Sequence, residues 1–164
     1  MVERVLERFC NLLRVMLGVL MAILAVPVAM QVLSRYTGVI PNYLWTEELS
    51  TFIFVWIVMI GSMVAVWDGT HFDVRIFPDA TTPLGKLLQQ GVVLVLILLF
   101  SVLFMIYGIE YAQFGSNQRS VMMRANLAIT YVSVPIAGTV WTLFAGFRLW
   151  KLIADWRAAR GAAS

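Results

Sequence analysis

Charged residues are scarce in this chain, and their scarcity excludes an ordinary soluble domain. Asp, Glu, Lys and Arg make up 13% of the 164 residues, whereas a soluble domain carries about 25%. Hydrophobic residues make up 61%, and the mean hydropathy is +0.86. This composition is typical of an integral membrane protein.

Cysteine and histidine are almost absent, since Cys10 and His71 are the single examples of each. One cysteine excludes an internal disulfide and a thiolate metal cluster, and one histidine excludes haem held by two histidines. The segment "DGTHFDV" brings Asp68, His71 and Asp73 close in sequence, but it favours a loop histidine bonded to backbone over a metal site. No nucleophile with its own base can be assembled either. The sequence therefore predicts no enzyme and no catalytic, cofactor-binding or metal-binding residue.

Four long runs lack any Asp, Glu, Lys, Arg or His: residues 15–34, 49–67, 87–109 and 125–147. A helix needs roughly 20 residues to cross the hydrocarbon core of a bilayer, and each run is about that long. We expect an all-α membrane protein in which residues 1–164 form one domain of four transmembrane helices. The first run exceeds the length of a signal-peptide core, so we expect it to be retained.

Basic residues are distributed unequally between the two predicted sides of the membrane. Nine of the 12 Lys and Arg fall on the N-terminus, the second loop and the C-terminus, and three fall on the first and third loops. The positive-inside rule then predicts cytoplasmic N and C termini. Because the basic residues adjoin membrane ends, the net charge of +3 indicates contact with anionic lipid rather than nucleic acid.

The N-terminal flank has an amphipathic pattern. Apolar residues recur at helical spacing among charged ones, namely Val2, Val5, Leu6, Phe9, Leu12 and Leu13. This pattern is typical of an interfacial helix. We expect it to lie on the inner leaflet and then turn into the first span.

Small residues mark two candidate packing faces. They are Gly18, Ala22, Ala25 and Ala29 in the first span, and Gly61 and Ala65 in the second. Such spacing lets another helix approach closely, either within this chain or from a partner. Pro27 and Pro135 lie inside the first and fourth spans, where each removes a backbone donor and favours a bend.

Ionisable residues are missing from the middle of all four runs. A solute or ion pathway through a membrane protein is usually marked by such residues. We therefore expect no substrate pathway in this chain. The same absence argues against a proton-coupled small multidrug exporter.

The segment "LWTEELSTFIFVW" sets Glu47 and Glu48 at the start of the second span. A helix N-terminus favours negative charge, and neighbours on a helix lie about 100° apart. We expect one glutamate to face headgroups or water and the other to turn inward to a basic or hydroxyl partner, with Arg35 as the leading candidate. The third loop, residues 110–124, is hydrophilic, and we expect it to face an external partner through Arg119 and Arg124.

Three ordered motifs resemble the small permease subunit, the DctQ type, of tripartite ATP-independent periplasmic (TRAP) transporters. They are "WTEEL" opening the second span, "GTHFDV" just after it, and "YVSVPIAG" in the fourth. The resemblance runs from about Arg14 to Trp150. By it, Trp45, Glu47 and Glu48 match the first motif, and His71 and Asp73 the second.

That resemblance implies a role in a bacterial inner membrane. It implies a large permease subunit (DctM type) that moves carboxylate-bearing solutes with sodium, and a periplasmic solute-binding protein (DctP type) that delivers them. The small subunit would brace and anchor the large one without a cofactor of its own. The alternative is a structural or assembly protein of four membrane helices that is unrelated to solute uptake.

Overall fold

The computed structural model describes residues 2–37, 41, 43–69 and 83–161. These residues form five helices: α1 (Val2–Thr37), α2 (Trp45–Asp68), α3 (Pro83–Ser116), α4 (Ala128–Tyr131) and α5 (Ser133–Gly161). Four segments are long and apolar enough to cross a membrane, because α4 and α5 together make one of them. The expectation of four transmembrane helices is confirmed.

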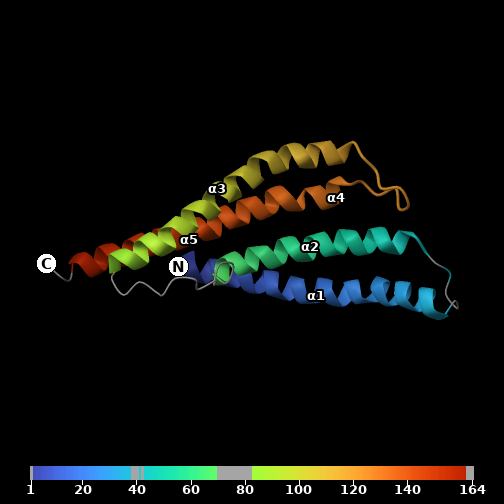
Figure 1. Ribbon diagram of the computed structural model, residues 1–164, viewed down its shortest axis with the longest axis horizontal. Helices are drawn as coiled ribbons and strands as arrows, with labels where there is room; N and C mark the ends of the chain where they lie inside the picture. The colour runs from blue at the N-terminus through green and yellow to red at the C-terminus, as the bar shows by residue number, and fades with distance from the viewer. Residues whose placement is uncertain (1, 38–40, 42, 70–82, 162–164) are drawn as a thin grey trace.

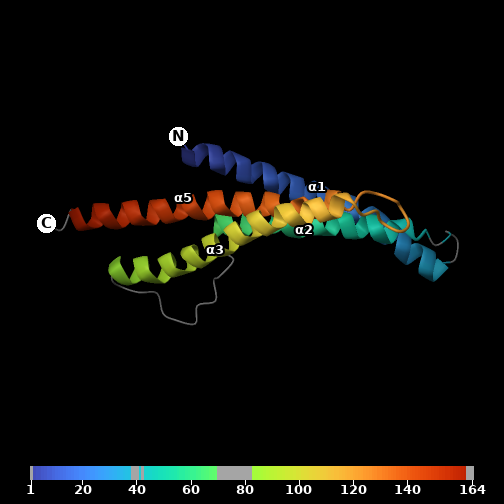
Figure 2. The same ribbon diagram turned by 90° about the horizontal axis from the view of Figure 1, so that it is seen from above.

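The long helices stand side by side in the order α1, α2, α5, α3 (Figure 1). The start of α1, the end of α2, the start of α3 and the end of α5 share one end of the molecule, called here the terminal end. The opposite end, called the hairpin end, carries the connection from α3 to α4. At the terminal end α1 and α3 diverge to opposite sides of the row (Figure 2). The row therefore has two free edges, one formed by α1 and the other by α3.

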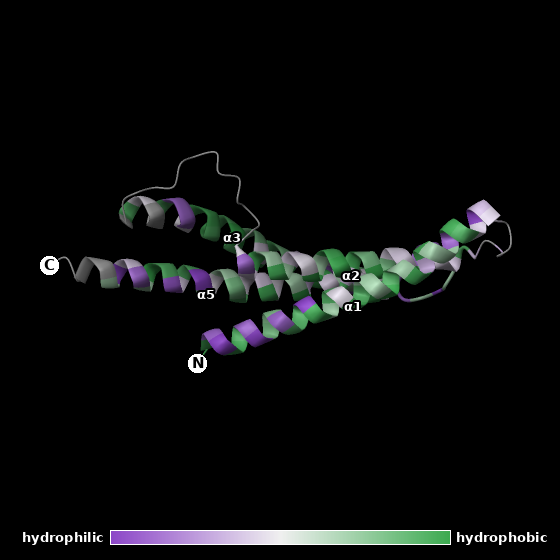
Figure 3. Ribbon diagram, turned by 90° about the horizontal axis from the view of Figure 1, so that it is seen from below, coloured by the Kyte–Doolittle hydropathy of each residue, from purple (hydrophilic) through white to green (hydrophobic). Residues whose placement is uncertain are grey.

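The N-terminal flank and the first span form one unbroken helix of 36 residues. The prediction of a turn between them is therefore wrong. Hydrophilic and hydrophobic residues alternate around its first turns, as predicted (Figure 3). No glycine or proline occurs between residues 2 and 17, and Cys10 and Leu13 are buried in the core. Continuous helix formers together with buried contacts keep the segment straight.

A heptad-like stripe joins α1 to α2. Its members recur every three or four residues and are all buried or half-buried: Cys10, Leu13, Leu17, Leu20, Leu24, Pro27, Gln31 and Ser34. A Cβ added at Gly61 of α2 would lie 3.9 Å from Leu17, and Gln31 Nε2 donates to Ser50 Oγ at 3.0 Å. Such spacing is typical of two helices that cross at a shallow angle. The helix also continues through Pro27, where a bend had been expected.

Helices α3 and α5 approach each other backbone to backbone, at positions where no small-residue face was predicted. A Cβ at Gly138 would lie 2.6 Å from the backbone nitrogen of Met105, and one at Gly108 would lie 2.8 Å from that of Pro135. Thr142 Oγ1 also donates to Ser101 Oγ at 3.0 Å. Backbone contact of this kind requires glycine and is a common basis of helix association in membranes.

The fourth span is interrupted near Pro135, in agreement with the bend expected there. Helix α4 ends at Tyr131, and α5 begins at Ser133, so the proline sits in the first turn of α5. Trp56 Nε1 in α2 donates to the carbonyl of Ile129 at 3.0 Å. This bond connects α2 to α4 across the middle of the row.

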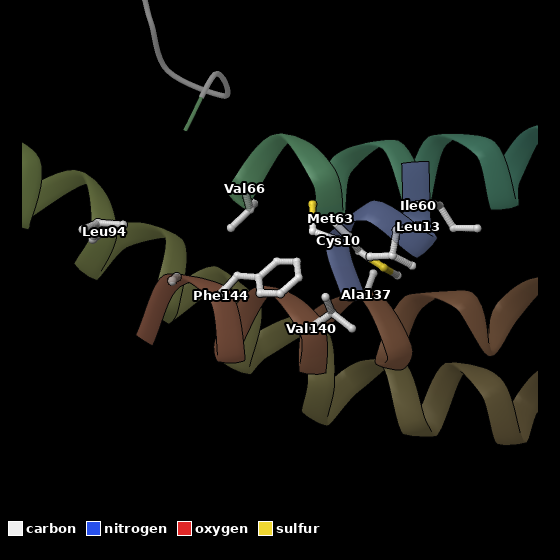
Figure 4. Packing of buried hydrophobic residues seen from close by; sticks show 10 residues of the cluster. Cys10, Leu13, Ile60, Met63, Val66, Leu94, Ala137, Val140 and Phe144 are labelled. Atoms are coloured by element: carbon white, nitrogen blue, oxygen red, sulfur yellow. The ribbon is translucent and has the colours of Figure 1, made fainter. Parts of the chain in front are cut away.

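The buried core lies where α1, α2 and α5 meet toward the terminal end (Figure 4). Phe144 is fully buried, with Ile60 and Met63 of α2 and Cys10 of α1 also in the core. The rings of Trp67 and Phe144 lie 5.1 Å apart and those of Phe9 and Phe144 6.1 Å apart. Cys10 and Leu13 of the N-terminal flank, which was expected to lie on the inner leaflet, therefore belong to the core.

Candidate interaction surfaces

The two glutamates at the start of α2 occupy different environments. Glu48 accepts hydrogen bonds from the backbone nitrogens of Met122 and Met123, each at 2.9 Å. Glu47 is exposed. The prediction that Arg35 is the partner of the inward glutamate is wrong. Arg35 lies at the end of α1 and is exposed, whereas Glu48 turns toward the α3–α4 connection. The row order explains this, because α2 lies between α1 and the helices that hold that connection.

Trp45 and Thr46 begin α2 beside the glutamates. Thr46 is buried, and both its backbone nitrogen and its Oγ1 donate to the carbonyl of Tyr43, at 3.0 and 2.7 Å. The rings of Tyr43 and Trp45 lie 6.2 Å apart. Both rings are exposed, as expected of aromatic residues at a membrane surface.

Residues 118–127 form a closed loop, called here the 118–127 hairpin, at the hairpin end. Ser120 N donates to Ala125 O at 2.8 Å, Ala125 N donates to Ser120 Oγ at 3.1 Å, and Leu127 N donates to Gln118 O at 3.2 Å. Arg124 has a φ of 51°, which closes the turn in the left-handed region. The loop thus has a defined backbone conformation.

The tip of the 118–127 hairpin is apolar and exposed. Val121 is 80% exposed, Met122 50% and Met123 37%. Arg119 and Arg124, which the sequence analysis assigned to partner contact, flank the tip and are exposed. The sequence indicated the arginines by their charge, but it gave no sign that Glu48, 74 residues away, holds the loop between them.

The terminal end of α2 is held by two arginines. Arg148 of α5 donates to the carbonyl of Val66 at 2.9 Å, and Arg14 of α1 pairs with Asp68. Gly69 ends the helix at φ 73°, with no room for a Cβ beside the Arg148 guanidinium. A cation there complements the helix C-terminus. A further ion pair joins Lys151 to Glu3, and so ties α5 to the start of α1.

His71 and Asp73, which match the second motif, lie outside the described residues. Among the residues that the structure describes, no group of three or more His, Cys, Asp or Glu could hold a metal ion.

The small-residue face of α1 is not covered by this chain. Gly18, Ala22, Ala25 and Ala29 are all exposed, and a Cβ at Gly18 would meet nothing within 4 Å. At 100° per residue this face lies roughly 145° from the stripe that packs on α2. Packing within the chain, one of the two options considered, is therefore wrong for these four residues. Gly61 instead faces α1, and Ala65 is half-buried.

Comparison with known proteins places the whole arrangement in a family. Residues 24–155 match the family model described as "Tripartite ATP-independent periplasmic transporters, DctQ component". A Haemophilus influenzae protein named "Putative TRAP transporter small permease protein" is 25% identical over 138 residues, which span 82% of this chain and 84% of that protein. The matched region contains Ala25 and Ala29 of the first span, the Glu47–Glu48 pair and the fourth-span motif. The chain belongs to the DctQ family of TRAP transporter small permease components.

Proposed function

We propose that this chain is the small membrane subunit of a sodium-coupled secondary transporter for carboxylate-bearing solutes in a bacterial inner membrane. It braces and anchors the large permease subunit and contains no substrate pathway. The family match supports the transporter assignment over an unrelated assembly protein. The spans carry no mid-membrane ionisable residue, which supports placing substrate and sodium in the large subunit.

The observation that carries the bracing role is the contrast between the two free edges of the row. The α1 edge presents Gly18, Ala22, Ala25 and Ala29 to the outside. The α3 edge exposes bulky residues: Val92, Val95, Leu96, Leu99, Phe100 and Leu103. Small residues favour close helix packing, whereas bulky aliphatic ones suit lipid tails. The α1 edge is therefore the face for a helix of the large subunit.

We also propose an orientation of the chain in the membrane. The terminal end carries Arg4, Arg8, Arg14, Arg148, Lys151 and Arg157, which supports its placement in the cytoplasm. The hairpin end then faces the periplasm, where Arg119 and Arg124 are exposed to a docked solute-binding protein.

Bulky substitution of the α1 edge tests the bracing role. Ala22→Leu with Ala25→Leu should weaken association with the large subunit by roughly 5- to 150-fold and so lower its copurified yield, because overpacking a close helix contact costs about 1–3 kcal/mol. The matched control is Val92→Phe with Val95→Phe, which adds bulk at the same spacing on the α3 edge and should leave the yield unchanged. Equal yields from both variants would reject α1 as the contact edge.

A further inference from the structure

The second glutamate of the "WTEEL" motif bonds to a loop 74 residues later in the chain. The Glu48 carboxylate accepts from two successive backbone nitrogens, Met122 and Met123, at 2.9 Å each. These two residues sit at the turn of the 118–127 hairpin, beside Val121 at its tip. Neither hydrogen bond uses a side chain of the hairpin, so the tip side chains remain free for contact.

The hairpin is already closed by hydrogen bonds of its own, two between backbone groups and one to the Ser120 hydroxyl, before Glu48 is counted. Residues 118–127 are bonded to each other at three points, and Asn126 Nδ2 donates to the carbonyl of Ser116 at 3.1 Å. Glu48 adds the connection to α2, which fixes the direction in which the tip points. An ordered loop has already lost the conformational freedom that binding would otherwise remove.

The tip presents an apolar surface that no other part of the described chain covers. Three adjacent apolar side chains, Val121, Met122 and Met123, are 80%, 50% and 37% exposed. Arg119 and Arg124 border them, and both are exposed. An exposed apolar patch with a polar rim is typical of a protein-binding site, and its two cations complement carboxylates on the other side.

We infer that Glu48 is a positioning residue for docking. It preforms the 118–127 hairpin so that Val121, Met122 and Met123 enter an apolar patch, rimmed by carboxylates, on the soluble solute-binding protein. This inference rests on the proposed function, which places the hairpin end in the periplasm. A lipid surface is the weaker occupant, because lipid adapts to a mobile loop and gains nothing from a fixed one, whereas a folded partner requires a defined shape.

The test uses the complete complex of small and large subunits in lipid nanodiscs, with the solute-binding protein as the probe in solution. Glu48→Gln removes the anionic acceptor, and Glu47→Gln changes the exposed neighbour in the same way as a matched control. Met122→Ser with Met123→Ser removes the apolar tip but keeps both backbone donors. Each variant is measured for docking affinity, for hydrogen exchange at amides 122 and 123, and for copurification with the large subunit.

Glu48→Gln should speed exchange at both amides and weaken docking by roughly three- to tenfold, with copurification unchanged. Glu47→Gln should change none of these. The tip variant should weaken docking while exchange at both amides stays slow. Adding Glu48→Gln to the tip variant should weaken docking little further, because positioning the loop helps docking only through the apolar side chains that this variant lacks. A merely structural glutamate would instead give losses that add.

Faster exchange with unchanged docking would overturn the inference. A thiol-reactive fluorophore on Val121→Cys should report burial only when the solute-binding protein is added. Burial before the solute-binding protein is added would place the tip against lipid or the large subunit, and would also overturn the inference. Failure of the wild-type subunits to copurify would refute the proposed function instead, so the two failures are distinguishable.

Discussion

Single glycines decide how closely the last two spans approach. Gly138 places the backbone of α5 against that of α3, where an added Cβ would lie 2.6 Å from Met105 N and 2.9 Å from the carbonyl oxygen of Ser101. Gly146, two turns further along α5, has nothing within 4 Å of its would-be Cβ. The two positions differ in their neighbours and not in their residue type, so the sequence alone does not distinguish them.

Gly138→Ala should lower the stability of the domain by about 1–3 kcal/mol, because the two backbones must separate to admit the methyl group. Gly146→Ala should be neutral or slightly stabilising, since alanine favours a helix. Thermal unfolding of both variants in the same detergent measures the difference. Equal unfolding temperatures would contradict the close contact at Gly138.

The adjacent residues Glu47 and Glu48 have different surroundings. Both were expected to mark a helix entry, and the expectation that they would face different ways agrees with the structure. The partner of the inward glutamate is a pair of backbone nitrogens rather than a basic side chain. Backbone donors leave no trace in composition or charge pattern, which is why Arg35 was the leading candidate.

At the scale of elements, α1 shows how burial overrides a local pattern. Its first turns are amphipathic and predicted an interfacial helix with a turn near Val15. Cys10 and Leu13 instead continue the stripe that packs on α2, so the helix extends straight through. Its length of roughly 54 Å exceeds the hydrocarbon core of about 30 Å. The helix is therefore longer than an upright crossing of the hydrocarbon core requires.

Spin labels on Glu7→Cys and Met21→Cys, in a Cys10→Ala background, test this continuity. Both positions are exposed, and 14 residues of unbroken helix separate their Cα atoms by about 21 Å. Pulsed electron resonance should give one distance near that value, broadened by the label arms. A turn near Val15 would bring the labels closer and give a shorter or bimodal distribution.

At the scale of the whole molecule, the row arrangement leaves much of each helix for other molecules to cover. Only the pairs α1–α2, α2–α5 and α5–α3 pack along their length within the described residues. Polar contacts secure the row at both of its ends: Glu48 at the hairpin end, and Arg148 and Arg14 at the terminal end. Under the proposed function, this array would widen and stiffen the large subunit.

Charge reversal at the hairpin end tests whether this molecule also contacts the soluble component. Arg119→Glu with Arg124→Glu should raise the concentration of solute-binding protein needed for half-maximal uptake by roughly tenfold, because favourable rim charges become repulsive. Arg157→Glu, an exposed charge at the terminal end, serves as the control and should leave uptake unchanged. Uptake that keeps its dependence on binding-protein concentration would refute the contact.

The sequence by itself determined the membrane class, the four spans and the lack of ionisable residues in the four apolar runs, since the length and polarity of a run decide whether it can cross lipid. It also carried the ordered motifs of the DctQ family. Only the tertiary structure decided which small residues pack inside and which face out, that α3 and α5 meet through glycines, and that Glu48 holds a distant loop. Those outcomes depend on which helix stands beside which, and helical periodicity describes the faces of each helix without naming their neighbours.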